Sequence, residues 1–227
     1  MNYDAAIRPI ADGRPIDSLI AAYAAKTLST PLAALVAAHL ELKPENRAYA
    51  AALEAVHGVF LAELRPVPLA GRDRRLVNIF ASPDLAPAPA APPRLSQEHT
   101  AMLPQALRRL AGRDFADLAW RNAASGVKEA PLRDASGAAR FVSVRPGKRL
   151  PMMREDGLAA AIVLAGCLSD HSGDHGRGDI ILVGDEADDE PVAKGDGDCV
   201  CFVVSEPESP AKGPGALRRA LQRMIGG

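Results

Sequence analysis

The first residues that could do chemistry are a histidine and two polar side chains at helical spacing. His39, Lys43 and Asn46 stand where one predicted helix ends and the next begins, and residues three and four apart share a helix face. Zinc would need imidazole, thiolate or carboxylate ligands at these positions. A lysine ammonium is no ligand, so His39 alone cannot hold a structural zinc. We predict a helix-end histidine at the domain surface.

A second candidate site lies in the glycine-bracketed segment 147–166. Met153 and Glu155 would share one face of a strand, because alternate residues point to the same side. A metal-dependent barrel needs imidazoles and carboxylates that converge on the ion. One glutamate beside a methionine cannot supply such a set. Glu155 is either a polar handle for a small ligand or, as the simpler assignment, a solvated loop carboxylate.

Two further pairs, of histidines and of cysteines, have simple structural explanations. His171 and His175 lie in a glycine-rich turn, where a spacing of four does not bring side chains together as it does on a helix. Cys199 and Cys201 alternate along an apolar strand and therefore face the same way, as small core hydrophobes do. The sequence shows no Ser/His/Asp or phosphate-binding motif. We therefore predict no catalytic residue, no metal and no cofactor.

Composition and charge limit the possible partners. The 227 residues are 48% hydrophobic with a net charge of −1, so the chain can bury a core but has no field to attract nucleic acid. Three cysteines do not make a disulfide framework, which favours a reducing compartment. The longest apolar run, 158–165, is too short to span a bilayer. We expect a cytoplasmic protein that binds neither DNA directly nor a membrane; its oligomeric state is left open.

Helical elements must position the first of these sites. Apolar residues recur at three and four positions through the N-terminal part of the chain, which predicts helices over 17–27, 31–42, 44–64 and 72–80. Asp17 is the expected N-cap of the first helix, and Ser29 or Thr30 that of the second. The proline-rich segment 85–100 should be an extended linker.

Strands must position the other sites. Short β-rich runs separated by glycine and aspartate predict an antiparallel sandwich or barrel, and residues 215–227 read as an amphipathic helix. The predicted fold class is α+β, with a small helical domain over 1–84, a linker over 85–100 and a β-barrel domain over 101–227. The β-rich runs are 115–122, 127–134, 139–147, 158–166, 179–185 and 199–206.

Three stretches together resemble the ChrR family of anti-sigma factors. They are DSLIAAYAAKTLSTPLAALVAAHLELKPENR (17–47), FADLAWRNAASGVKEAPL (115–132) and GDIILVGDEADDEPVAKGDGDCVCF (178–202). The resemblance covers nearly the whole chain after residue 15. It implies a zinc-binding helical domain that holds an extracytoplasmic-function sigma factor inactive, followed by a cupin-like domain.

The chain departs from the family pattern at its metal ligands. The family's helical domain uses an upstream histidine and a His-x3-Cys-x2-Cys signature. Here Arg14 stands near the first place, Lys43 and Asn46 replace both cysteines, and His39 is a remnant. The cupin ligand positions fall on Met153, Glu155, Ala159 and Asp189. The resemblance therefore implies that both zinc sites are absent.

The implied function is negative regulation of transcription. The N-terminal helices would sequester an extracytoplasmic-function sigma factor, and a metal-free cupin domain would act as a regulatory or ligand-sensing module with a possible pocket at Met153, Glu155 and Asp189. The alternative is a cupin-fold small-molecule enzyme or binding protein with a vestigial helical domain. The apolar residues expected to bind the partner, although sequence alone leaves a core role open, are Leu19, Ile20, Tyr23, Leu32, Leu35 and Val36.

Overall fold

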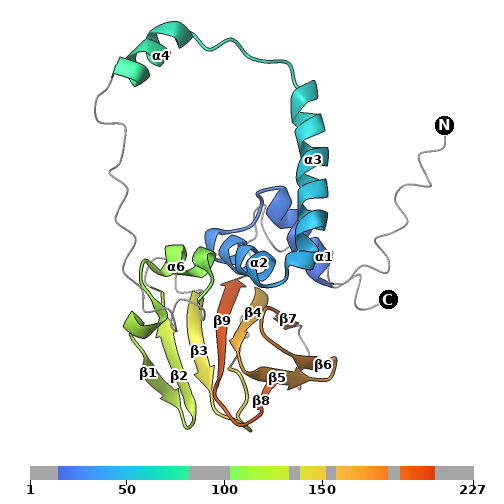
Figure 1. The fold of residues 1–227 in the computed structure, drawn as a ribbon, viewed down its shortest axis with the longest axis vertical. Helices are drawn as coiled ribbons and strands as arrows, with labels where there is room; N and C mark the ends of the chain where they lie inside the picture. The colour runs from blue at the N-terminus through green and yellow to red at the C-terminus, as the bar shows by residue number, and fades with distance from the viewer. Residues whose placement is uncertain (1–14, 82–102, 133–138, 152–156, 184–189, 208–227) are drawn as a thin grey trace, which may run out of the picture.

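The computed structural model describes residues 15–81, 103–132, 139–151, 157–183 and 190–207 (Figure 1). Helices come first in the chain and antiparallel strands follow, so the predicted α+β class is confirmed. The predicted linker and the predicted C-terminal helix lie outside the described residues. The helical elements are α1 (Pro15–Ala24), α2 (Thr30–Leu42), η3 (Pro44–Asn46), α3 (Arg47–Glu63), α4 (Arg72–Ala81), α6 (Gln105–Ala111) and η4 (Phe115–Asp117).

The ends of α1 and α2 follow from local chemistry. Ser29 caps α2, because its hydroxyl accepts a hydrogen bond from the Leu32 amide at 3.4 Å, which confirms one of the two predicted caps. Helix α1 begins at Pro15, a residue well suited to a first helical turn. Asp17 therefore lies inside the first turn, and its predicted role as N-cap is wrong.

The third predicted helix is confirmed with a modified start. The single turn η3 leads directly into α3. The guanidinium of Arg47 donates to the carbonyl oxygens of Leu40 and Glu41 at 2.6 and 2.9 Å, which satisfies carbonyls that the end of α2 leaves without helical partners. This contact fixes the direction in which α3 leaves α2.

Two antiparallel sheets make up the second half of the chain. The strand order of the larger is β1-β2-β3-β9-β4-β7, and that of the smaller is β6-β5-β8. No strand ladder among the described residues joins them, so the arrangement is the sandwich form of the predicted cupin-like β-domain. The strands are β1 (Arg121–Ala124), β2 (Val127–Pro131), β3 (Ala139–Val144), β4 (Gly157–Ala165), β5 (Cys167–Asp170), β6 (Gly173–His175), β7 (Ile180–Val183), β8 (Val192–Lys194) and β9 (Cys199–Pro207).

Helix α6 is absent from the sequence predictions, which began the β-rich region at residue 101. Its seven residues are held from outside: the carboxylate of Glu41 in α2 accepts hydrogen bonds from the amides of Gln105 and Ala106 at 2.7 and 2.8 Å. An anionic side chain at a helix N-terminus is favourable. Glu41 thereby ties α6 to α2, and the two helices lie together above the larger sheet (Figure 1).

The central strands of the larger sheet, β3, β9 and β4, are buried on both faces. Phe141, Ile162 and Phe202 point to one face and share a core with residues of α1 and α2, because alternate strand residues face opposite sides. Their neighbours Val142 and Cys201 point to the other face and pack against the smaller sheet. The helices and the smaller sheet thus cover opposite faces of one central layer.

Two glycines with the same backbone conformation give a test of this layering. Gly166 and Gly147 both have φ of +76°, but a Cβ on Gly166 would lie 2.8 Å from the Cα of Cys199, whereas one on Gly147 would meet nothing within 4 Å. We expect Gly147→Ala to lower the free energy of unfolding by about 1–2 kcal/mol, the cost of a left-handed alanine. Gly166→Ala should cost about 1–3 kcal/mol more because of the backbone clash. Urea unfolding measures both, and equal losses would contradict the close approach of β9.

Candidate functional site: the joint between helices and sheet

His39 lies at a joint between the helices and the β-domain. It is 3% exposed. Its Nδ1 lies 2.7 Å from the carbonyl oxygen of Gly178, and its Nε2 lies 2.7 Å from the side-chain amide nitrogen Nδ2 of Asn46. A carbonyl only accepts, so Nδ1 carries the proton and Nε2 accepts from Asn46. The histidine stands in the last turn of α2, but the predicted surface position is wrong, because the β-domain covers it.

An ion pair and a close backbone approach complete the joint. Lys43 Nζ lies 2.9 Å from Asp179 Oδ1, with 29% and 36% of the two side chains exposed. Gly178 has φ of +89°, and a Cβ there would lie 2.9 Å from that of Leu42. The peptide of Gly178 is itself anchored, because its amide donates to the carbonyl of Val163 in β4 at 2.8 Å. The end of α2 therefore rests directly on backbone fixed by the larger sheet.

These residues do not fit a zinc site. Zinc would require a nitrogen lone pair from His39 and two further anionic or imidazole ligands. The Nε2 lone pair is occupied by Asn46, and the ammonium of Lys43 is turned to Asp179. Within the described ranges, no group of three or more His, Cys, Asp and Glu residues is placed to hold a metal ion. A hydrogen-bonded pair stands where the family motif would place two metal ligands.

The surroundings keep His39 neutral. Burial lowers the pKa of its imidazole, and the nearby ammonium of Lys43 acts in the same direction. The Gly178 carbonyl and the carboxylates of Asp179 and Glu45 oppose this shift without reversing it. A neutral imidazole is also what the two hydrogen bonds require, since Nε2 must keep its lone pair to accept from Asn46.

The other predicted pairs have structural roles. His175 Nε2 lies 2.9 Å from Asp170 Oδ1 and 3.2 Å from Ser172 Oγ; one nitrogen makes both contacts, which is not the geometry of a nucleophile, base and orienting acid. His171 is exposed. Cys199 and Cys201 face the same way into the core, as predicted, with their sulfurs 3.7 Å apart. Their hydrogen bond, together with burial, raises the pKa of Cys201.

The predicted ligand pocket cannot be placed. Met153, Glu155 and Asp189 lie outside the described residues. The described residues in the interior of the β-domain are buried apolar side chains of the two sheets, among them Val142, Val163, Leu168 and Cys201. Ala159, the remaining cupin ligand position that the family resemblance implies, is a buried residue of β4 on this same interior face.

The predicted partner-binding residues are not exposed. Leu19, Ile20, Leu32, Leu35 and Val36 are each 0% exposed in the core shared with the sheet, and Tyr23 is half-buried against it. The set therefore takes the core role that the sequence had left open beside the binding role, in a core that helices and sheet share. The large apolar residues that are exposed lie further along the chain. On α3 and α4 they are Tyr49, Val56, Val59, Phe60, Leu61, Val77, Ile79 and Phe80.

Known proteins match this arrangement. No family model matches the chain. The anti-sigma-E factor ChrR of Cereibacter sphaeroides is 35% identical over 191 residues, which cover 84% of this chain and 87% of that protein. The chain belongs to the ChrR family of anti-sigma factors. The crystal structure of Rhodobacter sphaeroides SigE in complex with the anti-sigma ChrR matches with a TM-score of 0.67 and 32% identity, over 84% of this chain and 96% of that one.

Membership in the ChrR family sets the site residues in context. The residues of the family's helical zinc signature that differ here, Lys43 and Asn46, are the ones that join His39 in contacts with neighbouring elements. None of the described helices is long and apolar enough to cross a membrane.

The joint predicts unequal effects of two substitutions. Asn46→Ala removes the donor to a buried ring nitrogen and should lower the free energy of unfolding of the full chain by about 1–3 kcal/mol. Lys43→Met removes only a partly exposed ion pair and should cost at most about 1 kcal/mol. Urea unfolding of both variants at neutral pH makes the comparison. A larger loss for Lys43→Met would show that the ion pair, and not the histidine, holds the joint.

The lowered pKa of His39 predicts a pH dependence of stability. The unfolded histidine takes up a proton near its ordinary pKa of about 6.5, whereas the folded one resists protonation. Folding therefore binds fewer protons, so the contribution is fully present above about pH 6.5 and is lost as the pH falls towards the folded pKa. Urea unfolding of the wild type and of His39→Gln should show that the free energy of unfolding falls less steeply in the variant as the pH is lowered below about 6.5. Parallel curves would contradict the assignment.

Proposed function

We propose that this protein is an anti-sigma factor that sequesters an extracytoplasmic-function sigma factor in the cytoplasm and so represses transcription. The observation that carries the proposal is the exposed apolar surface of α3 in a chain of the ChrR family. The related crystal structure is of a ChrR protein bound to SigE. A sigma factor acts on cytoplasmic RNA polymerase, and that fact supports the location.

The proposed contact surface is the C-terminal half of α3. Val56, Val59, Phe60 and Leu61 are 52–69% exposed and lie on more than one side of the helix. An exposed helix that is apolar on several sides is atypical of a surface that meets only water. In Figure 1 this half of α3 extends beyond α1 and α2, away from the sheets. A partner can therefore surround it.

The other end of α3 is fixed. Ala50 is buried in the helical core, and Lys26 after α1 pairs with Glu54 of α3 at 3.0 Å. The free half is thus presented by an anchored half, which limits the entropy lost on binding. Helix α4 adds Val77 and Phe80, which are also exposed. We infer that α3 and α4 bind by inserting apolar helix faces into grooves of the sigma factor.

The proposed division of labour places sigma binding in 1–84, a linker at 85–100 and regulation in the cupin-like domain 101–227. Support for a regulatory connection comes from the shared core of α1, α2 and the larger sheet. Because this core crosses the proposed boundary, a fragment of 1–84 would expose Leu32 and Leu35. Binding is therefore best measured with the full chain.

We infer that the protein is not an enzyme, although the alternative of a cupin enzyme shares its β-fold. The buried side chains that the structure describes in the interior of the β-domain are aliphatic or cysteine, and none of them is a histidine or a carboxylate, the usual general acids and bases. Among the residues that the structure describes, the cluster of Asp170, Ser172 and His175 at the β5–β6 turn has the wrong connectivity for nucleophilic catalysis. A binding role therefore has the stronger support.

Substitution on α3 tests the proposal. We expect Phe60→Asp to weaken binding of the full chain to the sigma factor encoded nearest to its gene by about a hundredfold or more, because an exposed aromatic side chain that the partner would bury is replaced by a charge. Ala123→Asp, at an exposed position of β1, adds the same charge elsewhere and should leave binding unchanged. Calorimetry measures both. The absence of binding by the folded wild-type chain, or equal binding by both variants, would contradict the proposed surface.

A further inference from the structure

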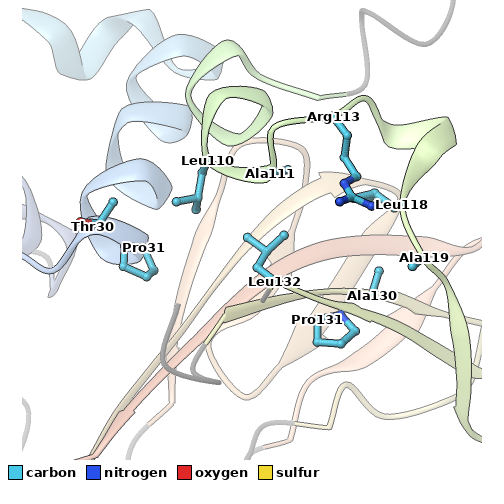
Figure 2. A pocket seen from close by; sticks show the side chains of 10 residues that line it. All are labelled: Thr30, Pro31, Leu110, Ala111, Arg113, Leu118, Ala119, Ala130, Pro131 and Leu132. Atoms are coloured by element: carbon cyan, nitrogen blue, oxygen red, sulfur yellow. The ribbon is translucent and has the colours of Figure 1, made fainter. Parts of the chain in front are cut away.

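A cavity of about 400 Å³ lies where the helices meet the C-terminal end of β2 in the larger sheet (Figure 2). Its walls come from three separate parts of the chain. The first turn of α2 contributes Thr30 and Pro31, the end of α6 contributes Leu110, and β2 and the residue after it contribute Pro131 and Leu132. The cavity is distinct from the His39 joint, from the interior between the two sheets and from the exposed part of α3.

The side chains that line this cavity are apolar except for Thr30 and Arg113, and polar atoms make up about half of its exposed surface. Arg113 is the charged residue among those lining it, and Figure 2 shows its side chain running from the end of α6 towards Leu118. Within the part of the chain that the structure describes, no ion pair or hydrogen bond engages its guanidinium. The adjacent acid, Asp114, lies 3.4 Å from Arg108 instead. The cavity therefore offers a positive group beside apolar side chains.

We propose that this cavity binds a small amphipathic carboxylate, such as a medium-chain aliphatic acid. A guanidinium presents two parallel N–H donors that match a carboxylate. The leucine and proline wall would take the aliphatic chain out of water, which is favourable in proportion to the area buried. The volume lies within the usual range for small-molecule sites. An alkyl amine of the same length would bring a second positive charge to Arg113 and is disfavoured.

The position of the cavity gives binding a mechanical consequence. A ligand that touches both the first turn of α2 and the end of β2 is bound only while α2 is packed against the sheet. It therefore stabilises this packed form in proportion to its occupancy. This proposal concerns the chain by itself and holds whether or not the partner is a sigma factor.

Titration of the full chain with octanoate, followed by calorimetry and thermal unfolding, tests the proposal. We expect saturable binding and a raised Tm with octanoate, and neither with octylamine. Arg113→Gln should weaken octanoate binding at least about tenfold, the scale of a lost charge-assisted pair. Arg109→Gln removes an exposed arginine of α6 that does not line the cavity and should bind as wild type does.

A cavity-filling variant keeps the test independent of Arg113. Ala119 is an exposed residue of the wall, so Ala119→Phe should fold and should also weaken octanoate binding. The proposal is overturned if the wild-type chain shows no saturable binding. Equal binding of octanoate and octylamine, or unchanged binding by both Arg113→Gln and Ala119→Phe, would overturn it as well.

Discussion

The arrangement of this molecule depends on the burial of one apolar helix face against one face of a sheet. Helices α1 and α2 are too short to enclose a core between themselves, and their leucines pack on the phenylalanines of β3 and β9 instead. Burial is not directional, so polar groups must set the relative position of the two layers. The doubly hydrogen-bonded His39 does this at the end of α2, and Glu41 does it for α6.

At this joint, a hydrogen-bonded pair stands where the resemblance to the ChrR family implies two zinc ligands. The sequence places an amide at position 46 and an imidazole at 39, seven residues apart across a helix break. In the structure the two groups satisfy each other and leave the second ring nitrogen for a carbonyl of the β-domain. His39 therefore links the end of α2 both to the turn before α3 and to the β-domain.

Periodicity was enough to predict much of the fold, and its failures have physical reasons. The helices at 31–42 and 72–80 and most strands were predictable, because their patterns and caps are local. Helix α6 was missed because seven residues have little helical signal, and its stabilising acid, Glu41, comes from another helix. The pattern at Leu32 and Leu35 correctly marked an apolar face but could not specify what covers it. The burial of His39 depends on Gly178, 139 residues later. The predicted pocket at Met153, Glu155 and Asp189 stays a prediction.

The first turns of helix α3 pack against neighbouring elements, whereas its C-terminal half is exposed. A change of angle at the packed end therefore moves the exposed end. The part of α3 after Glu54, which reaches Glu63, is about 13 Å long at the usual helical rise. A tilt of about 10° in this part would displace its far end by about 2 Å. The packed end is held by Asn46, which contacts His39, and by Arg47, which grips the end of α2. Small rearrangements where helix meets sheet are thereby enlarged at the tip, far from the place where they begin.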